Sequence, residues 1–229
     1  MKTEKVCYSE ATYVIGIITL ALGTALMERA DFGISMVVAP AYLLHLKISQ
    51  YFPAYSFGMS EYVLQAFLIV VMSIVLRKFK KSYLFSFVTA VIYGFALDLS
   101  MRMVGLLPLD GVMGRLLLYL TGMLLCAAGV AFLFHTYISP EAYELFVKEL
   151  SKKFGLRIDK VKTVYDCCSC LLGVLLSFMF FGFGHFEGVK FGTLICAVVN
   201  GWLIGRIGNI IEGLFTFRDA LSLHTEFDE

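Results

Sequence analysis

Ionisable and amide side chains inside long apolar segments are the residues of this sequence that could carry chemistry. Asp98 and Arg102 stand four residues apart, so on a helix they share one face and can pair. Asp166 lies about one turn into a second apolar segment, and Arg206 and Asn209 lie in a third. An ionisable side chain at the centre of a bilayer costs at least ~2.5 to 3.5 kcal/mol, which makes function its default explanation. We therefore expect these five residues to bind a small-molecule substrate.

Two further candidates, Glu28 and Asp31, lie where an apolar segment ends in the stretch TALMERADFGIS at 24–35. They mark either the outer interface, where charges at helix ends cost little, or a polar vestibule. Structural alternatives exist for the first set as well. Asp98 and Arg102 can form a local pair near the outer surface, and Arg206 can reach cytoplasmic lipid phosphates.

Signatures of soluble enzymes are absent from the sequence. It has no G-x-S-x-G elbow, P-loop, H-E-x-x-H helix or dinucleotide fingerprint. The six cysteines lack the paired C-x-x-C spacing of a zinc site, and a net charge of +1 without a basic domain gives no indication of nucleic-acid binding. We expect no enzymatic activity, no catalytic residue, no cofactor, no metal and no nucleic-acid partner.

Composition identifies the elements that must position these residues. Hydrophobic residues make up 59% of the 229 residues and the mean hydropathy is +0.81, well above the roughly 45–50% apolar content of soluble domains. Each apolar block is close to the ~20 residues that cross a bilayer. We expect an all-α membrane protein with a single transmembrane domain over 1–229 and six transmembrane helices at about 11–30, 60–77, 83–104, 114–135, 161–182 and 190–213.

The distribution of basic residues predicts the orientation of these helices. Cations gather between the second and third segments, at 77–81, and between the fourth and fifth, at 148–162. Loops rich in lysine and arginine remain in the cytoplasm. An even number of spans then places both termini inside, so we expect a multi-pass protein of the cell membrane, N-in and C-in.

The first half of the sequence recurs in the second at an offset of about 106 residues. Matching residues are Gly16 and Gly122, Gly23 and Gly129, Phe57-Gly58 and Phe154-Gly155 after a shorter loop, and Gly94 and Gly201. Three spans per half predict two inverted three-helix repeats, about 11–104 and 114–213. After the first span of each repeat, the segment 37–46 or 142–150 is too short to cross and should form a short amphipathic or re-entrant helix.

The closing pattern KFGTLICAVVNGWLIGRIGNII at 190–211 and the turn Lys-Phe-Gly-Leu-Arg at 153–157 carry a family resemblance. Together with the repeat, they make residues 13–215 resemble the YitT/YczE group of bacterial integral membrane proteins. Members typically have a Gly-Pro pair after the first span, which 31–34 and 138–140 preserve only approximately. The resemblance implies a transporter-like architecture in the bacterial inner membrane and no agreed biochemical activity.

Three functions fit these features. The leading hypothesis is a small-solute transporter or permease with a polar site between the two repeats. The alternatives are a substrate-capture subunit of a multi-component transporter and a membrane scaffold or accessory protein. The partners that we expect are the lipid bilayer and a small-molecule substrate, with a homodimer left open.

Overall fold

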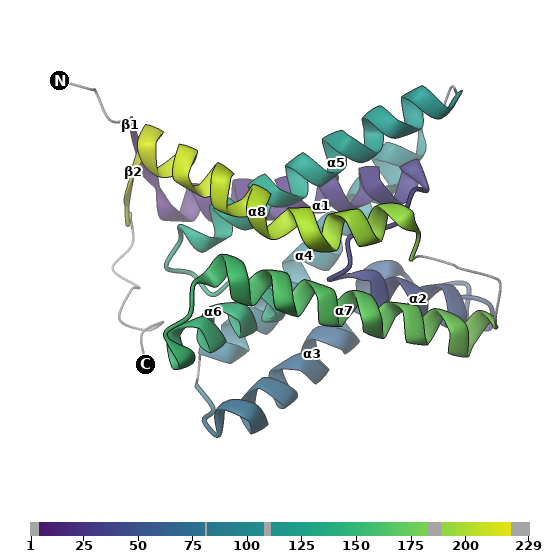
Figure 1. Ribbon diagram of the computed structural model, residues 1–229, viewed down its shortest axis with the longest axis horizontal. Coiled ribbons are helices and arrows are strands. Elements are labelled where there is room, and N and C mark those ends of the chain that lie inside the picture. Colours follow the sequence, from purple (N-terminus) through teal and green to yellow (C-terminus); the bar gives the residue numbers. More distant parts are fainter. Residues whose placement is uncertain (1–4, 81, 108–110, 183–188, 221–229) are drawn as a thin grey trace.

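The computed structural model describes residues 5–80, 82–107, 111–182 and 189–220, which form eight helices and two short strands (Figure 1). Their order is β1 (Lys5–Tyr8), α1 (Ser9–Ala30), α2 (Ala39–Ile48), α3 (Phe57–Leu76), α4 (Ser82–Gly105), α5 (Gly111–Phe134), α6 (Ala142–Phe154), α7 (Ile158–Phe181), α8 (Phe191–Leu214) and β2 (Phe215–Arg218).

Six of the described helices, all but α2 and α6, are long and apolar enough to cross a membrane, as predicted. Their outer faces fit a lipid environment. On α4, for example, Val88, Ile92, Phe95, Leu99 and Met103 recur every three or four residues and are all exposed. An exposed apolar stripe at helical spacing would be a liability in water and is ordinary against lipid tails. The expected all-α membrane fold is confirmed.

Helix α1 packs closely on α5, and these two are the most buried of the six spanning helices. A Cβ atom on Gly23 would lie 2.6 Å from the Cys126 backbone nitrogen, and one on Gly129 would lie 2.7 Å from the Leu20 backbone nitrogen. Small residues let two backbones approach this closely, and in a bilayer such packing drives helix association. The paired glycines found in the sequence thus have a packing role.

We expect Gly23→Ala to lower the free energy of unfolding by about 1–3 kcal/mol, because the added methyl group must push α5 away from α1. Gly205→Ala in α8 is the matched control, since nothing lies within 4 Å of a Cβ atom there. Thermal unfolding of both purified variants measures the difference. Equal melting temperatures would contradict the role assigned to the α1–α5 contact.

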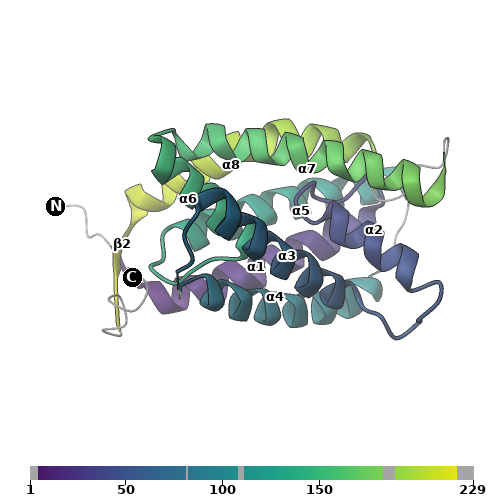
Figure 2. The ribbon, with the colours of Figure 1, turned by 90° about the horizontal axis from the view of Figure 1, so that it is seen from below.

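The two short segments form helices, as expected, and lie toward opposite ends of the molecule (Figures 1 and 2). Pro40 occupies the first turn of α2, where its fixed φ suits a helix start. Gly155 ends α6 with a φ of 63°, a left-handed conformation that glycine adopts without strain. The N-terminal halves of both helices are buried in the protein rather than laid on its surface. Each can therefore contribute side chains to the interior.

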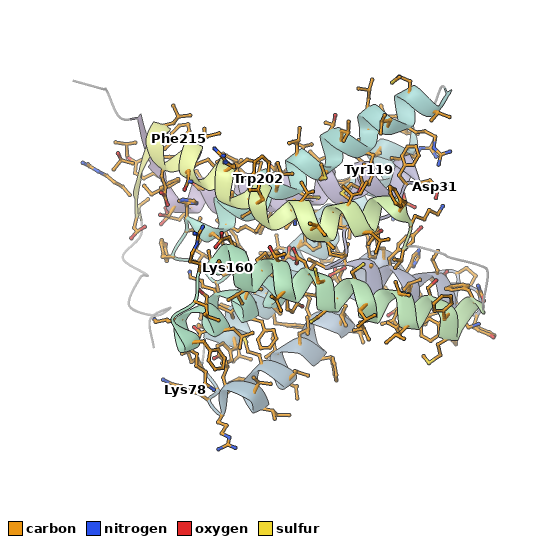
Figure 3. The ribbon with its side chains drawn as sticks, viewed as in Figure 1. Asp31, Lys78, Tyr119, Lys160, Trp202 and Phe215 are labelled. Atoms are coloured by element: carbon orange, nitrogen blue, oxygen red, sulfur yellow. The ribbon has the colours of Figure 1, made fainter. Side chains whose placement is uncertain are left out.

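The first and last elements of the described chain, β1 and β2, lie at one end of the molecule with both basic loops (Figure 1). Strands β1 and β2 pair in parallel there, a contact that the helical pattern of the sequence did not predict. Lys80 in the 77–81 loop pairs with Glu149 of α6, with Nζ and Oε1 3.0 Å apart. Figure 3 shows Lys78 and Phe215 toward this end and Asp31 at the other. The two predicted cytoplasmic loops thus share one end of the protein.

Candidate functional site

A buried ion-pair triad lies between α6 and α7. The Lys162 ammonium is 3.0 Å from Glu144 Oε1 and 3.0 Å from Asp166 Oδ1. Lys162 and Asp166 are 1% and 0% exposed, and Asn200 of α8 is buried and lines a small cavity together with Lys162. We call these four residues the Lys162 centre. Charges this deeply buried persist only when they are paired, and here two carboxylates share one cation.

A second polar group continues the site on α3. The Tyr143 hydroxyl donates to Glu61 Oε2 at 2.8 Å, and Gln65 Nε2 donates to the same oxygen at 3.3 Å. Gln65 Oε1 in turn accepts from the backbone N–H of Ala142 at 3.0 Å, which anchors the first turn of α6. Glu61 and Gln65 are fully buried. The interior therefore holds a hydrogen-bonded chain that runs from α3 into α6.

Glu141 stands between these two groups, at the start of α6 and outside the six spanning helices. Burial, together with the neighbouring carboxyl groups of Glu61 and Glu144, raises the pKa of Glu141 well above its usual value. Glu141 lines a cavity of about 20 Å³ together with Thr24, Tyr93, Cys126, Glu144, Lys162 and Asn200. A space of this size holds about one water molecule. The cavity is the meeting point of α1, α4, α5, α6, α7 and α8.

The helix positions of these residues correspond in the two halves. Glu61 and Gln65 are the fifth and ninth residues of α3, and Lys162 and Asp166 are the fifth and ninth of α7. Both pairs therefore have i, i+4 spacing at the same distance from the start of their helix. Equal helix positions pair residues of α3 and α7 that are 101 apart in the sequence, whereas Phe57-Gly58 and Phe154-Gly155 are 97 apart. The difference of four residues is about one helical turn. The match of the Phe-Gly pairs therefore does not reveal that Glu61 corresponds to Lys162, and the sequence places Lys162 among the loop cations.

Of the residues that the sequence suggested, Asp166 lies in the Lys162 centre, and Asp98 and Arg102 lie elsewhere. Asp98 is half-buried on α4, where its Oδ1 accepts from the backbone N–H of Gly58 at 3.0 Å and so caps the start of α3. Arg102 is exposed. In the described part of the chain no ion pair joins these two residues. Asp98 thus positions a helix that carries site residues.

The remaining candidates occupy the periphery. Arg206 and Asn209 are exposed and line a hollow of about 430 Å³, with the Arg206 guanidinium 5.4 Å from the centre of the Trp202 ring. Glu28 accepts a hydrogen bond from Tyr42 at 3.3 Å, and Asp31 ends α1 and pairs with Arg115 and Lys190. The structure therefore does not bring these residues to the Lys162 centre.

An apolar groove of about 590 Å³ lies next to the polar interior, between α3, α6 and α7. Leu64, Leu68, Phe146 and Leu172 contribute to its lining, and Tyr143 closes its inner side. Val37, which is buried, lines both this groove and the small cavity. Val37 is thus shared by a space of molecular size and the small cavity beside the charged groups.

Comparison with known proteins gives a family and no activity. No curated protein and no solved structure matches the chain. A family model described as a family of unknown function, DUF6198, matches residues 7–209. This range covers all six spanning helices except the last residues of α8, and it includes every residue of the Lys162 centre. The chain therefore belongs to the DUF6198 family.

Proposed function

We propose that this protein transports a small solute across the cell membrane and that the Lys162 centre is part of its solute site. The observation that carries the proposal is a fully buried lysine held between two carboxylates among spanning helices. Polar and charged groups are expensive inside a membrane and commonly mark a substrate or ion pathway. The charges of the centre suit a solute that itself carries a charged or strongly polar group.

The arrangement of the helices supports the inverted repeat on which such a mechanism rests. Helices α1 and α5 pack on each other, and α2 and α6 lie toward opposite ends (Figures 1 and 2). The i, i+4 polar pairs at equal positions of α3 and α7 add a correspondence in the interior. In transporters built this way, the halves rock around a site at their interface. The resemblance to the YitT/YczE group is in accord with this architecture.

The sizes of the two spaces indicate how a solute would enter. A cavity of about 20 Å³ is too small for an organic solute, so on this proposal the solute site is closed to its solute in this conformation. The groove of about 590 Å³ has the volume of a small-molecule pocket. Movement of Val37 and of the first turn of α6 would join the two spaces. Opening therefore requires a conformational step, as alternating access does.

Orientation can be tested with single cysteines introduced into a variant that lacks the six native ones. We expect Lys80→Cys and Lys152→Cys to react only with a membrane-permeant reagent in intact cells, because positively charged loops remain in the cytoplasm. Tyr55→Cys should react with an impermeant reagent added outside. The fourth informative position, His185, lies outside the described residues. Labelling of position 80 from outside would overturn the N-in, C-in topology.

Transport can be tested once a solute is found by thermal-stability screening of the purified protein, since a ligand of the native state raises its apparent stability. Radiolabelled flux of that solute is then measured in proteoliposomes. We expect Glu144→Gln to abolish flux, and Glu149→Gln, which removes a surface partner of Lys80, to retain it. Flux in the Glu144 variant equal to that of the unaltered protein would refute the assigned site. Binding without flux would instead indicate a capture subunit.

A further inference from the structure

Glu61 and Glu141 are buried carboxyl groups that no cation of the described chain contacts. In the part of the chain that the structure describes, no lysine, arginine or histidine nitrogen lies within 4 Å of either, whereas Glu144 and Asp166 both contact Lys162. Glu61 is 0% exposed and Glu141 is 2% exposed. An isolated ionised carboxylate at such depth would be very costly, and such a group usually takes up a proton instead.

The hydrogen bonds of the two carboxyl groups leave room for that proton. Gln65 donates to Glu61 Oε2 and accepts from the backbone N–H of Ala142, the residue after Glu141, so one amide links Glu61 to the start of α6. Glu61 Oε1 and Glu141 Oε1 have no partner within the described structure. Each free oxygen can carry a proton without displacing an existing donor. The Gln65 amide is neutral and so does not offset the charge of either carboxylate.

Asn200 provides an independent indication that the adjoining cavity holds a hydrogen-bonding ligand. Its Oδ1 is buried and unpartnered among the described residues, and Asn200 lines the cavity with Glu141. A space of about 20 Å³ accepts about one water molecule, which needs two to four polar partners. No group of three or more His, Cys, Asp or Glu side chains in the described chain is arranged to hold a metal ion. The burial of Glu61 and Glu141 without a contacting cation favours a proton, exchanged through water, as the bound cation.

We propose that Glu61 and Glu141, which Gln65 links through the start of α6, form the proton-binding site of the transport cycle. A proton from water adds to a carboxylate oxygen when the interior opens to one side and returns to water when it opens to the other. The role in a transport cycle rests on the proposed function. Proton binding itself follows from the burial of the two carboxyl groups. The titratable groups that face Glu141 or interact electrostatically with it are Glu61, Glu144, Lys162, Tyr93, Tyr143, Tyr13 and Cys126. Those facing Glu61 are Tyr143, Glu141 and Tyr93.

Infrared difference spectra of the purified protein, recorded as the pH is raised from the usual range of carboxyl groups to alkaline values, test the site directly. The carbonyl stretching band of a protonated carboxylic acid should be present at the lower pH and lost on raising it. We expect Glu61→Gln and Glu141→Gln each to remove about half of the titrating band and the double variant to remove it, because each carboxyl carries one proton. Glu149→Gln, at a partly exposed ion pair on α6, should leave the band unchanged.

A titrating band that persists in the double variant would overturn the proposal. The absence of the band from the unaltered protein would also overturn it, and this second measurement does not depend on the folding of any variant. The measurement requires no solute. A protein that shows the band and yet moves no solute would therefore refute the transport function while retaining the proton site. Flux without the band would refute the proton site alone.

Discussion

Lys162→Met is expected to be the most destabilising single substitution that we consider. Methionine fills a similar volume, but it leaves Glu144 and Asp166 buried without their shared cation. Breaking a buried ion pair from one side costs about 3–5 kcal/mol. For a chain of this size, that loss lowers the apparent Tm by roughly 6–20 °C, at about 2–4 °C per kcal/mol. The deficit should grow as the pH rises, because the two carboxyl groups then ionise in the interior.

Two further variants separate lost charge balance from lost packing. Replacing the whole triad, with Lys162→Met, Glu144→Gln and Asp166→Asn together, removes every charge and should recover most of the Tm. Lys80→Met breaks an ion pair near the surface, whose value is at most about 1 kcal/mol, and is the matched control. A single Lys162→Met variant as stable as the Lys80→Met control would mean that the triad is not ionised.

Hydropathy and length were sufficient to predict the architecture. Each spanning helix was expected from a block of apolar residues near the length of a bilayer crossing, and the ends of α1 and α4 lie within about two residues of the expected bounds. The β1–β2 contact was beyond reach, because a four-residue strand such as Phe215–Arg218 pairs only through tertiary proximity. The inverted relation of the two halves stays a prediction.

The site was harder to predict because charge alone does not reveal depth. Lys162 follows a series of loop cations, yet α7 begins at Ile158, so Lys162 lies more than one turn inside the helix. Glu61 near the start of α3 resembles an interfacial residue in the same way. Conversely, Arg102 and Arg206 lie in apolar segments but reach the surface. Whether such a side chain is buried depends on which face of its helix it occupies and on which neighbouring helix covers that face. Sequence periodicity does not identify the covering helix.

Asp166→Asn and Asp98→Asn form a pair of isosteric substitutions with opposite expected results. Asp166 is fully buried against Lys162, so the amide removes half of the negative charge that faces the cation and should abolish solute flux. Asp98 accepts one hydrogen bond from the Gly58 N–H, and an asparagine oxygen can accept the same bond. Its variant should therefore transport at close to the unaltered rate.

Both variants are measured in parallel for solute-induced thermal stabilisation and for flux in proteoliposomes. A folded Asp166→Asn protein that neither binds nor transports would place the solute at the Lys162 centre. A result in which Asp98→Asn is the inactive variant would move the site to the α3–α4 contact, where the sequence alone first suggested it. Asp98→Ala then separates the two roles of this residue, because alanine removes the cap as well as the charge. Loss of stability in Asp98→Ala alone identifies Asp98 as the residue that holds the start of α3, and hence Glu61, in position.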